Sequence, residues 1–188
     1  MKIKKTIIPI IIFLILLVTA FSDVFARENT YRIGAGDMIE ISVWKDESLS
    51  RQLVVPPDGV IAFPLIGDID VTELTVAETR EVVSKRLKEY VTDAEVTVML
   101  LNANSLIAYV VGKVNTPGQF PINMETSVMQ ILAMAGDLNE FASAGNIIIL
   151  RQQDGIVIKI PFDYDDVKKG KKLEQNIFLK RGDVVVVP

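Results

Sequence analysis

The 188-residue sequence contains no cysteine, no histidine and a single tryptophan. Without cysteine the chain cannot form a disulfide, supply a thiol nucleophile or carry a lipid on an N-terminal cysteine, so we do not expect a lipoprotein. Without histidine it lacks the usual general base and the commonest ligand for transition metals. The fold must therefore be held by its apolar core, and we expect neither a metal centre nor a cofactor.

The first 26 residues have the three parts of a secretory signal peptide. Three lysines precede an apolar run over residues 6–21, and small or aliphatic residues stand one and three places before a cut after Ala26. The apolar run is slightly shorter than the roughly 20 residues that span a bilayer. We therefore expect residues 1–26 to be a cleaved signal peptide; an uncleaved anchor is the alternative.

Acidic residues outnumber basic ones by 24 to 20. Removal of residues 1–26 takes away three lysines and one aspartate and leaves 17 basic and 23 acidic residues, a net charge of −6. Nonspecific nucleic-acid binding needs a basic face, so this charge argues against it. The one dense basic run, residues 168–172, is interpreted as a solvated loop or as a contact for an acidic sugar polymer or a membrane.

The remaining sequence divides near residues 102–105 into two small modules, each mixing strands with a helix. In the first, alternation predicts a strand at residues 38–44, and a Pro-Asp-Gly turn predicts a hairpin between strands at 53–55 and 60–63. Thr75 and Glu78 have the spacing of a capping box, which marks the start of a helix. The residues expected on its buried stripe are Val76, Val83, Leu87 and Tyr90, and a strand over residues 95–101 follows.

The second module is expected to contain a short helix over residues 128–135, capped by Thr126 or Ser127 and ended by Gly136. Its expected strands are residues 106–111, 119–122, 147–150, 156–160 and 183–187. The fold class is therefore α+β, two small mixed α/β modules in which a helix covers one face of a small mixed sheet. Gly36-Asp37 and Gly182-Asp183 both stand just before a strand, which we interpret as one turn device used twice.

Without histidine and cysteine, paired carboxylates are the remaining candidates for catalysis or metal binding, and the sequence does not favour them. Asp68, Asp70 and Glu73 cluster, but the sixth and twelfth positions counted from Asp68 are not the glycine and glutamate of a calcium loop. A glycan hydrolase needs two acids about 5–9.5 Å apart across a cleft, and no pair is convincing. We interpret these residues as turn aspartates, assign no catalytic residue, and expect a protein that is not an enzyme.

Several motifs, in order along the chain, resemble a known bacterial family. Residues 31–37 (YRIGAGD), 41–44 (ISVW), 55–59 (VPPDG), 63–68 (FPLIGD) and 74–78 (LTVAE) resemble the polysaccharide export domain of capsule and exopolysaccharide exporters. Residues 110–114, 116–121, 134–138 and 179–188 resemble the soluble-ligand-binding β-grasp (SLBB) domain that follows it. The resemblance implies an export domain over residues 27–103 and a β-grasp domain over residues 104–188, closest to the short exporters of exosortase-linked clusters.

The resemblance implies a periplasmic, outer-membrane-associated component of an export machinery, which forms an oligomeric conduit for exopolysaccharide or capsule. The implied partners are the polysaccharide, further copies in a homo-oligomeric ring, and an inner-membrane polysaccharide copolymerase or chain-length protein. Long members carry a lipidated cysteine and a C-terminal pore helix, which are not found here, so we expect a separate outer-membrane pore protein. The alternative function is a soluble periplasmic carbohydrate-binding module without export activity.

Residues expected to contact polysaccharide or a neighbouring subunit come from the same motifs. They are Trp44, Pro57, Asp58, Gly59, Phe63, Pro64, Gly67 and Asp68 in the first module, and Gly112, Pro117, Gly118 and Gly136 in the second. Proline fixes φ and glycine permits tight turns, so the simpler interpretation of residues 56–71 is rigid architecture that serves assembly. Trp44 is interpreted as a sugar-stacking platform, a core residue or a subunit contact.

Overall fold

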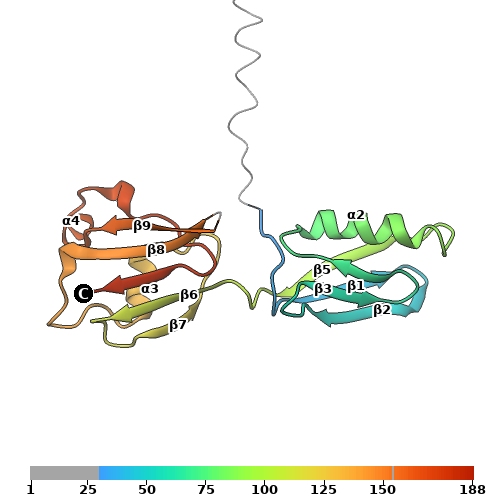
Figure 1. Ribbon diagram of the computed structural model, residues 1–188, viewed down its shortest axis with the longest axis horizontal. Coiled ribbons are helices and arrows are strands. Elements are labelled where there is room, and N and C mark those ends of the chain that lie inside the picture. The colour runs from blue at the N-terminus through green and yellow to red at the C-terminus, as the bar shows by residue number, and fades with distance from the viewer. Residues whose placement is uncertain (1–29, 154) are drawn as a thin grey trace, which may run out of the picture. The chain divides into compact units, whose positions relative to one another are not determined.

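The computed structural model describes residues 30–153 and 155–188, so the predicted signal peptide lies outside the described residues. Two separate hydrophobic clusters, one within residues 33–98 and one within residues 106–187, confirm the α+β fold of two modules (Figure 1). Within the described part of the chain, no helix has the length and apolar character needed to cross a bilayer.

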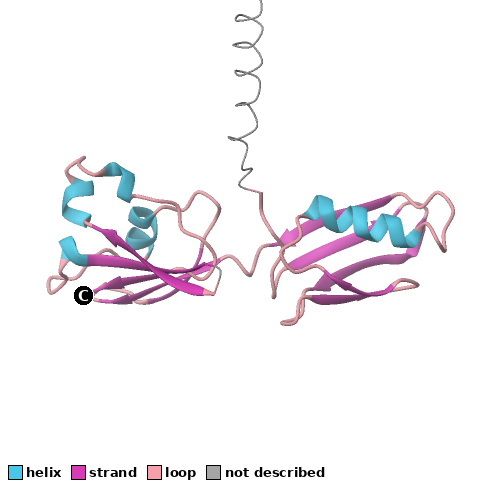
Figure 2. Ribbon diagram, turned by 45° about the horizontal axis from the view of Figure 1, so that its top comes forward, coloured by secondary structure: helices cyan, strands magenta, loops and turns pink. Residues whose placement is uncertain are grey.

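The first module is an antiparallel sheet with one helix on it. Strands β1 (Met38–Val43), β2 (Asp46–Val54) and β5 (Val96–Asn102) lie in the order β2-β1-β5, with β1 paired antiparallel to both neighbours. Figure 2 shows helix α2 (Val76–Leu87) lying along one face of this sheet. Alternate residues of β1 are fully buried beneath it, as the alternation predicts. The sheet contains no parallel pair among the described residues, so only the second module has the mixed sheet that we expected of both.

The prediction of a hairpin across the Pro-Asp-Gly turn is wrong. β2 pairs with β1, whereas β3 (Val60–Phe63) pairs with β4 (Gly67–Asp70) across the turn that follows it. The physical reason lies in the two prolines at residues 56 and 57, which lack the N–H that a continuing ladder requires. The buried Val55 instead donates its N–H to the carbonyl of Asp37, and the chain then leaves the first sheet.

The start of α2 follows its sequence signal. The Thr75 side chain accepts from the N–H of Glu78, and the Glu78 carboxylate accepts from the N–H of Thr75, so the predicted capping box is confirmed. Val83 and Leu87 are buried on the predicted stripe. The prediction is wrong for Tyr90, which is 61% exposed because the helix ends three residues before it.

The second module is a five-stranded mixed sheet in the order β7-β6-β10-β8-β9. Strand β10 lies at its centre, parallel to β6 and antiparallel to β8. The core lies between the sheet and helices α3 and α4, which contribute Ile131, Leu132 and Val167 to it. The strands are β6 (Ile107–Gly112), β7 (Gly118–Pro121), β8 (Ile147–Gln153), β9 (Ile156–Phe162) and β10 (Val184–Val187), and the helices are α3 (Val128–Met134), α4 (Tyr164–Lys168) and the 3₁₀ turns Ala144–Asn146 and Leu173–Gln175.

Gly112, at the end of β6, lies against the backbone of β10. Its φ is +98°, and a Cβ added there would lie 2.0 Å from the carbonyl oxygen of Val187. Only glycine permits both this backbone conformation and this close approach. The last residues of the parallel pair β6–β10 therefore depend on the absence of a side chain at this position.

We expect Gly112→Ala to lower the free energy of unfolding by more than about 1 kcal/mol, because it adds a backbone clash to the strain of positive φ. The matched control is Gly170→Ala, where φ is +75° but nothing lies within 4 Å of the added Cβ. Urea unfolding of both variants measures the difference. Equal losses in the two variants would contradict the close approach at β10.

Candidate functional site

The two Gly-Asp turns are built in the same way. Asp37 and Asp183 are both fully buried. In each turn a carboxylate oxygen accepts from the N–H three residues earlier, Gly34 or Lys180, at 2.8 Å, and the aspartate N–H donates back to that residue's carbonyl at 3.1 Å. The glycine before each aspartate has positive φ, 91° and 79°. The interpretation of one turn device used twice agrees with this geometry.

The same two carboxylates also tie each turn to a distant segment. Asp183 binds the Arg151 guanidinium through Nε at 2.9 Å and through Nη2 at 2.6 Å, which connects the start of β10 to β8. Asp37 accepts from the N–H of Ser105 at 2.8 Å and from the hydroxyl of Tyr31. The first aspartate therefore connects the start of β1 to the segment that leads into the second module.

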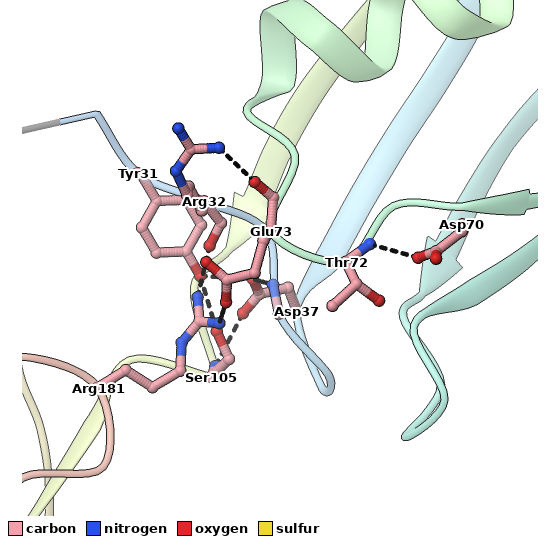
Figure 3. Close-up of polar contacts among 9 residues, drawn as sticks. Tyr31, Arg32, Asp37, Asp70, Thr72, Glu73, Ser105 and Arg181 are labelled. Carbon is pink, nitrogen blue, oxygen red and sulfur yellow. Dashed lines mark hydrogen bonds and ion pairs between the residues drawn. The ribbon is translucent and has the colours of Figure 1, made fainter. Parts of the chain in front are cut away.

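Arg181, in the turn before β10, contacts the first module directly (Figure 3). Its Nη2 donates to the carbonyl of Arg32, and its Nη1 lies 3.4 Å from the carboxylate of Glu73. The guanidinium also lies over the Tyr31 ring, 5.8 Å from the ring centre. Gly34 leaves room for it, since a Cβ there would lie 2.3 Å from Arg181 Nη1.

This junction is the part of the structure that sequence reasoning missed. The one local signal was the motif Gly34-Ala35-Gly36-Asp37, which we interpreted as a turn and not as space for a side chain from another module. Burial, and then the hydrogen bond to Asp37, raise the pKa of Tyr31 to about 12. In the second module, burial and the hydrogen bond to Asp137 likewise raise the pKa of Tyr164 to about 12.

Within residues 56–71, the predicted site residues form a turn and a hairpin. Asp58 accepts from the N–H of Val60 at 3.1 Å, which is the turn-capping contact expected of it. Gly59 has a φ of 74°, and a Cβ there would lie 1.8 Å from the Thr72 hydroxyl oxygen. Pro57 is exposed in the same turn, so this end of the segment brings Pro57, Asp58 and Gly59 together.

At the other end of the segment, Phe63 is buried in the core and only 3% exposed. Pro64 begins the turn of the β3–β4 hairpin, and Gly67 ends it with a φ of 67°. Asp68 is exposed on β4, and its carbonyl accepts from Arg86 of α2 at 2.7 Å. These contacts hold the hairpin against its own module, in keeping with an architectural role.

Of the predicted residues in the second module, three surround the loop between β6 and β7. Gly112 begins this loop, and Pro117 and Gly118 end it in exposed positions. Gly118 has a φ of 159°, near fully extended backbone, with nothing within 4 Å of an added Cβ. Gly136, just after α3, joins them because its carbonyl accepts from the Asn115 side chain at 2.6 Å.

Trp44 is 69% exposed, so its interpretation as a core residue is wrong. It stands in the turn after β1 and lines an open pocket with Lys45 and with residues 91–95. The ring is therefore accessible to a ligand or a neighbouring subunit.

The carboxylates and the basic run are engaged in local contacts. Asp70 accepts from the N–H of Thr72 at 2.9 Å, and this hydrogen bond lowers the pKa of Asp70. Lys172 lies 2.7 Å from Asp166, and Lys168 lies over the Tyr164 ring. Across residues 30–153 and 155–188, no group of three or more acidic side chains is placed to hold a metal ion.

One face of the second sheet is mostly apolar and, among the described residues, no helix covers it; we name it the bare face. The helices of this module gather on the opposite side of the strands (Figure 2). Successive pairings place Gln119, Tyr109, Val184, Leu150 and Lys159 in one row across the sheet. The apolar residues of the bare face are Ile107, Tyr109, Val111, Pro121, Ile148, Leu150, Val157, Pro161, Val184 and Val186.

Comparison with known proteins gives two adjacent family matches. Residues 26–101 match the family described as polysaccharide biosynthesis/export protein, and residues 106–187 match the SLBB domain. The chain is 32% identical over 138 residues to the EPS I polysaccharide export outer membrane protein EpsA of Ralstonia nicotianae. The aligned region is 61% of this chain and 36% of EpsA.

Two further relatives carry names of the same kind. The polysialic acid transport protein KpsD of Escherichia coli is 28% identical over 123 residues, which is 64% of this chain and 22% of KpsD. The exopolysaccharide production protein ExoF of Rhizobium meliloti is 23% identical over 124 residues, which is 60% of this chain and 30% of ExoF. The match thus spans 36% or less of the length of each of these three relatives.

The raised pKa of Tyr31 predicts a pH dependence of stability. A phenol whose pKa is higher in the folded state contributes stability that is fully present below its unfolded pKa of about 10 and is lost as pH rises toward 12. We expect the free energy of unfolding to fall over this interval, and to fall less steeply in Tyr31→Phe. Urea unfolding at several pH values measures the slope. Tyr164→Phe is the matched comparison, and an unchanged slope in Tyr31→Phe would contradict the junction contact.

Proposed function

The chain belongs to the bacterial polysaccharide biosynthesis/export proteins, and on that premise we propose that it is a component of an exopolysaccharide or capsule export machinery. The observation that carries the proposal is that two family models match the chain one after the other, the export family over the first module and the SLBB domain over the second. The proposal gives this chain the polysaccharide export role that the names of its longer relatives state. The role is transport, in which shape and hydration guide the polymer and no bond is broken.

The proposed location is the periplasm, in association with the outer membrane. The N-terminal basic and apolar pattern supports export, and the EpsA relatives are named as outer membrane proteins. With no cysteine in the sequence, attachment through a lipidated cysteine has no residue to use. The proposed partners are a copolymerase or chain-length protein in the inner membrane and a separate pore protein in the outer membrane.

The bare face supports the proposal that copies of this chain associate with one another. Tyr109, Val111 and Val157 are 40%, 41% and 62% exposed there, so large apolar groups on both sides of the bare face are open to solvent. Contiguous apolar surface of this kind marks an interaction site in soluble proteins. The proposed occupant is the bare face of a second copy, since two twisted sheets pack face to face through interdigitating side chains.

The polar residues of the bare face are Gln119, Gln152 and Lys159; they lie toward its edges and ends and favour a second copy. Gln119 on β7 and Lys159 on β9 stand at opposite ends of one row, with Tyr109, Val184 and Leu150 between them. A twofold axis parallel to the strands would set Lys159 of one copy against Gln119 of the other and leave the apolar centre facing itself. This is the apolar core and polar rim of a specific interface. The proposed ring needs a second contact per copy, for which the unpaired edges of β7 and β9 are available.

We expect the chain without residues 1–26 to form dimers or larger assemblies at about 100 µM, and Val186→Lys to be monomeric, because it places a charge in the centre of the bare face. Sedimentation equilibrium measures both. Phe141→Lys is the matched control, since Phe141 is 71% exposed and lies outside the bare face. A monomeric parent chain would contradict the proposed association, and an associated Val186→Lys variant would contradict the proposed surface.

We expect deletion of the gene to lower polysaccharide outside the cell while polymer in the periplasm persists or rises. The measurement is the amount of polymer in each fraction, with restoration by the intact gene as the control. Loss from both fractions would point to synthesis in place of export. Normal polymer outside the cell would contradict the export role and favour a carbohydrate-binding module.

A further inference from the structure

An open pocket lies beside the N-terminal end of α3, between that helix and the segment that precedes β10. Among the described residues, its lining consists of Asn123, Glu125, Ser127, Met129, Gln130, Asn176 and Phe178. Three of these are side-chain amides, one is an aromatic ring, and one is a carboxylate. The predicted site residues are all elsewhere, so this pocket is not part of the set that the sequence motifs suggested.

The three amides are oriented by the backbone. Gln130 Oε1 accepts from the N–H of Ser127 at 2.7 Å, as the second half of the α3 capping box. Asn176 Oδ1 accepts from the N–H of Met129 at 3.0 Å, and Asn123 Oδ1 accepts from the N–H of Glu125 at 2.9 Å. Because a backbone N–H only donates, the group that faces it is the carbonyl oxygen, which settles the orientation of each amide.

Each amide NH2 group then has no partner within the described protein, and those of the exposed Asn123 and Gln130 are open to solvent or to a ligand. Within residues 30–153 and 155–188, no hydrogen-bond acceptor engages the NH2 groups of Asn123, Gln130 or Asn176. Their oxygens are held by the cap and turns, so the donors are fixed before any ligand arrives. Preorganised donors of this kind lose little entropy on binding.

Phe178 supplies an apolar platform in the same pocket. Its ring is 54% exposed, although its backbone carbonyl is held at 3.0 Å by the buried Arg151. An exposed aromatic ring beside polar side chains offers a surface for the apolar face of a sugar ring. Donors for hydroxyl oxygens, the Glu125 acceptor for hydroxyl protons and a flat apolar ring together match the two faces of a pyranose.

The charge of the pocket selects among sugars. Glu125 is the one ionisable side chain among the described residues that line it, and no lysine or arginine lines it. A uronic acid would place its carboxylate near Glu125 without a counter-charge, which is unfavourable. The lining therefore favours a neutral sugar ring.

We propose that this pocket is a subsite for a neutral sugar residue of a polysaccharide chain. The proposal deepens the proposed function and rests on it for the expectation that a polysaccharide meets this protein. The amide NH2 groups of Asn123, Gln130 and Asn176 donate to ring hydroxyl oxygens, Glu125 accepts from a hydroxyl, and Phe178 packs against the apolar face of the ring.

Nitrogen-15 NMR of the chain without residues 1–26 tests the site, because side-chain NH2 groups give their own signals. The probes are cellohexaose, neutral oligosaccharide fragments of the host's extracellular polymer, and hexagalacturonate, each at up to about 20 mM. We expect the NH2 signals of Asn123, Gln130 and Asn176 to move with a neutral probe. Absence of movement with every probe overturns the site, and tighter binding of hexagalacturonate overturns the neutral class.

Gln130→Glu and Asn176→Asp separate binding from folding. Each keeps the oxygen that accepts from the backbone, so the melting temperature should hold, and each removes one NH2 donor, which should weaken sugar binding about tenfold. Asn139→Asp is the matched control, because Asn139 Oδ1 also accepts from a backbone N–H, that of Phe141, outside the pocket. Equal sugar affinity in all three variants overturns the proposal.

The outcomes are separable from those for export. If deletion of the gene blocks export but the pocket binds none of the oligosaccharides, only the subsite is overturned. Sugar binding in a protein whose deletion leaves surface polymer normal removes the export role and keeps the subsite.

Discussion

The buried aspartates Asp37 and Asp183 are the interaction on which both modules depend. A buried carboxylate is costly unless hydrogen bonds fill its oxygens, and each of these receives three donors. In both modules the aspartate joins a tight turn, the first residue of the following strand and one distant segment. Without the distant partner, part of a buried carboxylate would lack a hydrogen bond, so the stability of each turn depends on long-range structure.

How far the sequence predicts the fold depends on how local each signal is. The capping box of Thr75 and Glu78 lies within four residues, and it located the start of α2 correctly. For α3 both Thr126 and Ser127 were candidates; Ser127 caps the helix, whereas the Thr126 hydroxyl bonds to Asn123. Signals of this kind rest on adjacent backbone groups, and they need no knowledge of tertiary structure.

Strand pairing and the exposure of single side chains were not predictable in this way. The alternation of β1 buries Ile39, Ile41 and Val43 and places Trp44 on the other side, but it does not tell whether that ring meets solvent, a ligand or a subunit. The strands around the Pro-Asp-Gly turn looked like a hairpin because pairing was judged from neighbours in sequence. The Arg181 contact with Arg32 joins residues 149 apart, and the one local signal, Gly34, was equally consistent with an ordinary turn. The pocket beside α3 likewise needs residues 176–178, which only the folded module brings next to that helix.

The place of β10 in its sheet has a consequence for how the protein is made. This strand holds β6 and β8 together, so the second sheet has no continuous centre until residues 184–187 have been synthesised. Pairings between segments so far apart in sequence form slowly, because a long loop must close first. The second module therefore cannot complete its sheet before residues 184–187 are made, an order that suits the export proposed above. In the first module the central strand β1 is made first, and the sheet is complete when β5 pairs with it at residues 96–102.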